Sequence, residues 1–219
     1  MLPSCGLALV LLMDVSGSIS DTNYIMQRDA AADAMVSVDV ISAIKGEGSI
    51  AITVIEWAHS SKTVIPWRVL SEPEDLAQLA LDMKDIKRTG EGMTALVKAY
   101  EEGIKAFDTV PCEPIRMVID ISGDGIDNTG EISKTSEVRD EAFRLGIVVN
   151  GLPIITPIEP TLVDYYADQV VTIGGFVIIA DGFEAFGKAM RKKLTYEISN
   201  ILPSKQYAVT VPTMLLWSK

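Results

Sequence analysis

The chain carries, at residues 7–18, the stretch LALVLLMDVSGS. Its first part, Leu7–Met13, is wholly apolar and far shorter than the ~18 residues that a membrane-spanning helix requires. A short apolar run that ends in a polar turn is typical of a strand buried on both faces, as in a parallel sheet. We therefore expect Leu7–Met13 to be such a strand, with Asp14, Ser16 and Ser18 in the loop that follows it.

Strand-length apolar runs alternate with helical patterns along the rest of the chain, which is typical of an α/β fold with a mostly parallel sheet. Ser49–Trp57 and Ser61–Trp67 are separated by too few residues for a helical crossover, so we expect an antiparallel pair. Further strands are expected at Ile115–Ile121, Ile147–Pro153 and Phe176–Ile179, and helices at 20–36, 71–84, 94–107, 134–145, 162–169 and 181–200. These elements predict a doubly wound α/β fold: a mostly parallel six-stranded sheet with one antiparallel edge strand and helices on both faces.

Local signals refine the element boundaries. Ser71 and Glu74 have the spacing of a capping box, so Ser71 is expected to cap the helix at 71–84. Gly146 is expected to end the helix at 134–145 in a left-handed conformation. We find no repeat or linker, so we expect one domain over residues 6–200. The tail at 201–219 shows no clear period, and its structure stays open.

Composition limits the classes of function. Hydrophobic residues make up 48% and charged residues 22% of the chain, as in ordinary soluble domains. The formal net charge of −11 disfavours nucleic acid, which requires clustered Lys and Arg. No apolar run is long enough for a transmembrane segment. The first expected strand leaves no room for a signal peptide, so we expect either a cytosolic protein or an exported one whose leader was removed.

Three polar segments lie where a sheet of this kind binds ligands, outside the carboxyl ends of its strands. Residues 14–18 follow the first strand, 92–94 open the helix at 94–107, and 122–125 follow Ile115–Ile121. Each segment alone is more often a polar turn or a helix cap. Together they offer two carboxylates and three hydroxyls, the oxygen ligands that Mg²⁺ prefers. The candidate ligands are Asp14, Ser16, Ser18, Thr94 and Asp124.

This pattern of Asp-x-Ser-x-Ser, a later Thr and an Asp-Gly after a strand resembles the metal-ion-dependent adhesion site of von Willebrand factor A and integrin I domains. The resemblance covers roughly residues 6–200. It implies that some of the five candidate ligands bind the ion directly and others through water. It also implies that an acidic residue of a protein partner completes the coordination. The usual form is Thr-Asp-Gly, whereas here Gly123 is an extra residue before Asp124.

The chain is similar, more closely still, to a bacterial family of uncharacterised exported proteins with this fold. The residues that carry this similarity are VIDISGDG at 118–125, NGLP at 150–153 and IEW at 55–57. In the loop after residue 125, Asp127 and Asn128 are candidates to hydrogen-bond to the metal ligands without binding the ion themselves, or else solvated turn residues. His59 is expected at the surface, with no catalytic role.

The two cysteines, Cys5 and Cys112, form no C-x-x-C motif, which disfavours zinc and redox sites. In this fold each cysteine precedes one of two adjacent parallel strands. Their α-carbons can then approach within the ~4.4–6.8 Å of a disulfide. We expect that disulfide, with two unrelated buried thiols as the alternative. Because disulfides persist in oxidising compartments, the pair favours a periplasmic or secreted protein.

The favoured function is a metal-dependent protein-binding module that holds one Mg²⁺, or Mn²⁺ or Ca²⁺, and is not an enzyme. Its partner is a protein that offers a Glu or Asp carboxylate, while the partner's identity and the oligomeric state stay open. One alternative is a haloacid-dehalogenase-like, Mg²⁺-dependent phosphatase, in which Asp14 is the nucleophile. Such enzymes need an acid two residues later, where this chain has Ser16. A structural domain with an empty site is the third reading.

Overall fold

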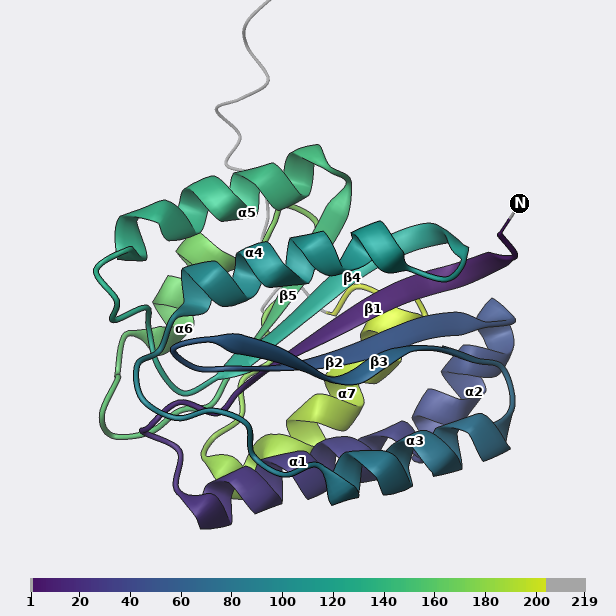
Figure 1. The fold of residues 1–219 in the computed structure, drawn as a ribbon, viewed down its shortest axis with the longest axis horizontal. Helices are drawn as coiled ribbons and strands as arrows, with labels where there is room; N and C mark the ends of the chain where they lie inside the picture. The colour runs from purple at the N-terminus through teal and green to yellow at the C-terminus, as the bar shows by residue number, and fades with distance from the viewer. Residues whose placement is uncertain (1, 204–219) are drawn as a thin grey trace, which may run out of the picture.

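The apolar run near the start of the chain forms β1 (Ser4–Asp14), and every residue of β1 after Ser4 is buried. It pairs in parallel with β2 (Ile50–Trp57) on one side and with β4 (Glu113–Gly123) on the other. The computed structural model describes residues 2–203. The sheet has the order β3-β2-β1-β4-β5, and the winding reverses direction between β1 and β4 (Figure 1).

The two edges of the sheet differ. β3 (Ser61–Leu70) is antiparallel to β2, as the short connection predicted, whereas β5 (Ile147–Pro153) is parallel to β4. The expected α/β class, the doubly wound parallel sheet and the antiparallel edge strand are therefore confirmed.

Helices cover both faces of the sheet (Figure 1). One face, and one apolar core, belongs to α1 (Asp21–Met35), α2 (Val38–Glu47), α3 (Pro73–Asp85) and α7 (Phe186–Ile198). The other face and the second core belong to α4 (Leu96–Ala106), α5 (Thr135–Arg144) and α6 (Leu162–Tyr165). None of the helices in the described part of the chain is long and apolar enough to cross a bilayer.

The expected sixth strand at Phe176–Ile179 is wrong, because the described residues form a sheet of five strands. Val177 of this segment forms an isolated parallel bridge with Gly151 of β5. Ala180, just after the segment, forms a second one with Ile154, just after β5. Pro153 lies between the two bridges and has no amide hydrogen to donate. The ladder is interrupted there, since proline removes one of its hydrogen bonds.

Two local expectations also need correction. The helix α2, in which only Val40 and Ile44 are buried, is not among the expected elements. The capping box of α3 lies one residue later than expected: Glu72 is the N-cap, and Asp75 Oδ2 accepts hydrogen bonds from the amides of Ser71 and Glu72. Pro73 can open the helix because its missing amide hydrogen would be unpaired there.

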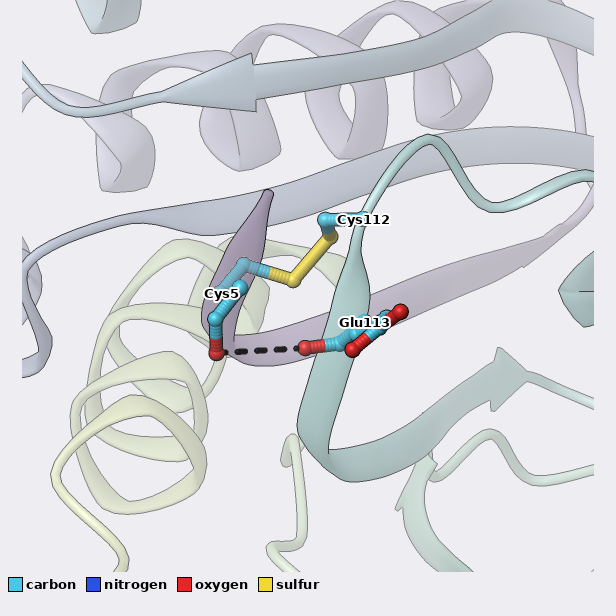
Figure 2. The surroundings of a disulfide bond; sticks show 4 residues. Cys5, Cys112 and Glu113 are labelled. Atoms are coloured by element: carbon cyan, nitrogen blue, oxygen red, sulfur yellow. Dashed lines mark hydrogen bonds between the residues drawn. A yellow bond between two sulfur atoms is a disulfide. The ribbon is translucent and has the colours of Figure 1, made fainter. Parts of the chain in front are cut away.

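The disulfide expected between Cys5 and Cys112 is present, with their α-carbons 5.9 Å apart (Figure 2). Cys5 lies at the start of β1, and Cys112 directly precedes β4. Both cysteines are buried, and the Ser4 hydroxyl donates a hydrogen bond to the Glu113 carbonyl beside them. The bond therefore ties together the amino-terminal ends of the two strands whose carboxyl ends carry the candidate metal ligands.

A buried charge cluster ties α7 to the middle of the sheet. Lys193 Nζ lies 2.6 Å from Asp120 Oδ1 on β4 and 2.7 Å from Glu197 Oε1 on α7. Asn150 of β5 donates a hydrogen bond of 2.9 Å to the same Glu197 oxygen. Burial, and then repulsion by Asp120, raises the pKa of Glu197 to about 8. This environment therefore favours the protonated form of Glu197 in the folded protein.

We expect the free energy of unfolding to fall as pH rises from about 5 to 8. Unfolding restores the ordinary Glu197 pKa of 4.5, so between 4.5 and about 8 the folded state binds a proton that the unfolded state has released. Stability then decreases with pH, by up to about 1.4 kcal/mol per pH unit for one group. Urea unfolding at several pH values in EDTA, for wild type and Glu197→Gln, measures this slope.

The comparison with Glu197→Gln isolates the contribution of Glu197, because every other titrating group is common to both proteins. The variant is expected to show a flatter stability profile between pH 5 and 8. Parallel profiles for the two proteins would contradict the assignment of the raised pKa to Glu197.

Candidate metal centre

The candidate site lies where β1 and β4 end side by side. Asp14 is the last residue of β1, and Asp124 directly follows Gly123 at the end of β4. Asp14 Oδ1 accepts a hydrogen bond of 2.7 Å from the Ser16 amide, which holds the carboxylate over its own loop. The Gln27 amide of α1 donates to the Asp14 carbonyl at 3.0 Å and fixes the backbone at this corner.

The three hydroxyls form a chain that ends on the second carboxylate. Thr94 Oγ1 lies 3.3 Å from Ser16 Oγ, and Ser16 Oγ lies 3.3 Å from Ser18 Oγ. Ser18 donates a hydrogen bond of 2.6 Å to Asp124 Oδ1. The structure thus places in one cluster side chains that lie up to 110 positions apart in the sequence.

Both carboxylates of this cluster, Asp14 and Asp124, are buried. Asp14 Oδ2 has no hydrogen-bond partner among the residues that the structure describes. Burial, and then repulsion by Asp124, raises the pKa of Asp14 to about 7. Burial also raises the pKa of Asp124. A divalent cation between the two carboxylates would remove this repulsion and give Asp14 Oδ2 a partner.

The donor set fits Mg²⁺ in kind and in spacing. Neighbouring ligands of an octahedral ion with bonds of 2.0–2.1 Å lie about 3 Å apart, close to the oxygen separations of 2.6–3.3 Å in the cluster. Within residues 2–203, no group of three or more His, Cys, Asp or Glu side chains is placed to hold a metal. An ion at this site would therefore depend on the hydroxyls as well as on both carboxylates.

Gly123, the departure from the usual adhesion-site pattern, does not keep Asp124 out of the cluster. β4 remains paired with β5 through Gly123, so Asp124 leaves the strand directly beside Ser18. A β-carbon at position 123 would lie 2.8 Å from Asp14 Oδ2 and 3.1 Å from the Tyr166 hydroxyl. A side chain there would collide with the Asp14 carboxylate, which explains why this position holds glycine.

The loop after Asp124 forms hydrogen bonds with the segment that carries Thr94. Asn128 Oδ1 accepts a hydrogen bond of 2.8 Å from the Thr94 amide, so Asn128 contacts the backbone of a candidate ligand. Asp127 is buried and faces elsewhere: its Oδ2 accepts from the Val97 amide at the start of α4, and its Oδ1 accepts from Thr129. Asn128 therefore supports the site directly, whereas Asp127 acts through the helix that follows Thr94.

Two residues that are not among the sequence-predicted site residues, Glu56 and Arg88, hold the loops of the site. Glu56 is buried near the end of β2 and accepts hydrogen bonds from Tyr24 and Thr89. Arg88 donates to the carbonyls of Val15 and Ser16. An acidic residue inside a strand that is buried along its whole length was the available signal for Glu56. The sequence carries no such signal for Arg88, because the role of Arg88 depends on contacts between distant segments.

The sheet order, with one antiparallel edge strand and helices on both faces, gives this chain the fold of von Willebrand factor A domains. Solved structures with this fold include proximal thread matrix protein 1 from the mussel byssus, with a zinc-occupied adhesion-site motif (15% identity, 90% of this chain and 47% of that chain, TM-score 0.63). They also include a von Willebrand factor type A protein from Catenulispora acidiphila (15%, 89% and 43%, 0.65). A third is the von Willebrand domain of the pilus tip protein Mfa5 from Porphyromonas gingivalis (8%, 92% and 98%, 0.62).

At these identities the likeness concerns the fold, and the chain spans about half the length of the mussel and Catenulispora proteins. The chain belongs to the family described as "Protein of unknown function (DUF1194)", whose model matches residues 4–202. Comparison with curated protein sequences finds no match.

Proposed function

We propose that this protein is a metal-dependent protein-binding module. One divalent cation, Mg²⁺ or else Mn²⁺ or Ca²⁺, is held by the five side chains of the cluster and recognises a Glu or Asp carboxylate on a protein partner. The observation that carries the proposal is the buried Asp14 Oδ2, which no residue of the range 2–203 partners, beside a second buried carboxylate, Asp124. Uncompensated buried charge is costly unless a cation pairs with it.

The exposure of the surrounding loops supports a binding role. Asp14, Ser16 and Thr94 are buried, whereas the neighbouring residues Gly17, Ser18, Gly92 and Met93 are exposed. The cluster is therefore closed from below by the sheet and open toward solvent on one side. Two carboxylates balance the charge of a divalent ion, while the neutral hydroxyls add no further negative charge. Such an ion can still attract a carboxylate from outside.

The choice of cation and the location of the protein are parts of the same proposal. An oxygen-only donor set favours Mg²⁺, Mn²⁺ or Ca²⁺, although the mussel protein of this fold holds zinc at its motif. A periplasmic or extracellular location is supported by the Cys5–Cys112 disulfide and by the pilus-tip protein among the similar structures. We do not propose the phosphatase, because the position of its general acid is Ser16, a buried hydroxyl in contact with Thr94.

A carboxylate probe tests the recognition step. In Mn²⁺-loaded protein, N-acetylglutamate amide is expected to displace water from the ion and lower the relaxation rate of water protons. The matched N-acetylglutamine amide is expected to leave that rate unchanged, since it has no carboxylate to offer. Free Mn²⁺ titrated with the same compounds supplies the correction for binding in solution. Equal responses to the two compounds would contradict recognition of a carboxylate.

A further inference from the structure

We propose that Arg88 is a positioning residue of the metal centre, which locks together the two loops that carry its ligands. The inference rests on the metal site proposed above. One loop, residues 14–18, contains Asp14, Ser16 and Ser18, and the other, residues 86–95, contains Thr94. Arg88 belongs to the second loop and donates hydrogen bonds into the first.

The contacts of Arg88 are directed at the backbone of both loops. Its Nη2 donates to the Val15 and Ser16 carbonyls, each at 2.9 Å. Its Nε donates to the Gly90 carbonyl of its own loop at 3.0 Å. Its Nη1 pairs with Asp21 at the start of α1, also at 3.0 Å. One planar guanidinium thus fixes the backbone on both sides of Ser16 relative to the segment that leads to Thr94.

A direct backbone contact shows how closely the two loops approach. The Gly17 amide donates to the Gly92 carbonyl at 2.8 Å. A β-carbon at position 17 would lie 3.2 Å from that same oxygen, so the approach leaves little room for a side chain. The separation between the Ser16 and Thr94 side chains therefore depends on how the two loops pack against each other. Arg88 and the Gly17–Gly92 hydrogen bond fix that packing.

Glu56 and Tyr24 hold Arg88 in place from the protein interior. Glu56 Oε1 accepts a hydrogen bond of 2.7 Å from the Tyr24 hydroxyl, and its Oε2 accepts from the amide and hydroxyl of Thr89, the residue after Arg88. The Arg88 guanidinium carbon lies 5.8 Å from the centre of the Tyr24 ring. Arg88 keeps this orientation because Thr89, the next residue in the sequence, is hydrogen-bonded to the buried Glu56 carboxylate.

The sign of the expected effect distinguishes positioning from simple electrostatics. Arg88 carries a positive charge close to the cation site, so removal of that charge by itself should strengthen binding of a divalent ion. Loss of the orientation of the ligand loops should instead weaken it, typically by 10–100-fold for groups that orient metal ligands. A decrease in affinity therefore shows that positioning outweighs repulsion.

The test compares Arg88→Met with Arg116→Met. Arg116, near the opposite end of β4, also donates to two carbonyls, those of Glu197 and Ile198, and pairs with an acidic residue, Glu47. Both variants lose similar interactions and are expected to melt at lower temperature in EDTA. Only Arg88→Met is expected to bind Mg²⁺ and Mn²⁺ at least about tenfold more weakly in calorimetry.

The outcomes separate this inference from the proposed function. If wild type binds no divalent ion, the metal site itself fails. If wild type and Arg88→Met bind with the same affinity, or the variant binds more tightly, only the role of Arg88 is overturned. Should Arg88→Met not fold, Arg88→Lys decides, because it keeps the charge but lacks the planar fork that reaches both carbonyls. Wild-type affinity in Arg88→Lys would then overturn the proposal.

Discussion

Asp14→Asn is expected to abolish binding of divalent metal and, at pH 8, to make the metal-free protein more stable than wild type. The amide is close in shape to the carboxylate and can still accept the hydrogen bond from the Ser16 amide, but it carries no charge for a cation. The pKa of Asp14, raised from 3.8 to about 7 by burial and by Asp124, means that its charge is unfavourable in the folded, metal-free state. Removal of that charge is therefore worth on the order of a few kcal/mol above pH 7.

Calorimetry and thermal melts of metal-stripped protein measure both effects. In wild type, Mg²⁺, Mn²⁺ or Ca²⁺ at 100 times its dissociation constant should stabilise the folded state by about 2.7 kcal/mol and raise the Tm accordingly. Asp14→Asn should show no such rise. The matched control is Asp85→Asn, the same change at an exposed position near the end of α3, which should respond to metal as wild type does. Saturable binding of one ion by Asp14→Asn would place the metal elsewhere.

Loss of the Cys5–Cys112 disulfide is expected to produce the largest change in stability without metal. The bond joins residues 107 positions apart. The chain-entropy model assigns about 4.7 kcal/mol to a loop of roughly 100 residues. For a domain of this size, 1 kcal/mol corresponds to about 2–4 °C, so reduction should lower the Tm by roughly 10–20 °C.

Thermal melts with and without reductant, on wild type and on the Cys5→Ala/Cys112→Ala double variant, test this expectation. The double variant should melt near the temperature of reduced wild type and should not respond to reductant. A shift of similar size in the double variant would show that reductant acts on something other than this bond. Metal binding should persist in the double variant, because the disulfide lies at the opposite end of β1 and β4 from the ligands.

The order of strands and helices could be predicted because most elements carry a local signal. The β1 run and the short connection between β2 and β3 each depend on residues close together in the sequence. The expected strand at Phe176–Ile179 failed at one residue, Pro153 of β5, whose missing amide hydrogen interrupts the ladder. Neither segment reveals this interruption by itself, because it depends on which residues the pairing places opposite Pro153. α2 was missed since it buries only Val40 and Ile44.

The sequence by itself determined the chemistry of the candidate site. Two acids, two serines and one threonine stand at strand ends or just before a helix, and a parallel sheet brings its strand ends to one edge. The pairing of Cys5 with Cys112 likewise followed from the order of two adjacent strands.

Only the tertiary structure decided how these residues are held. Asp14 is buried by elements from several parts of the chain, and none of the described residues donates a hydrogen bond to its Oδ2, so its raised pKa could not be read from its neighbours in sequence. Arg88 is hydrogen-bonded to Ser16, which lies 72 positions away in the sequence, and Glu56 is hydrogen-bonded to Thr89, which lies 33 positions away. Such roles depend on distances between segments that fold against one another, and no local pattern of residues encodes those distances.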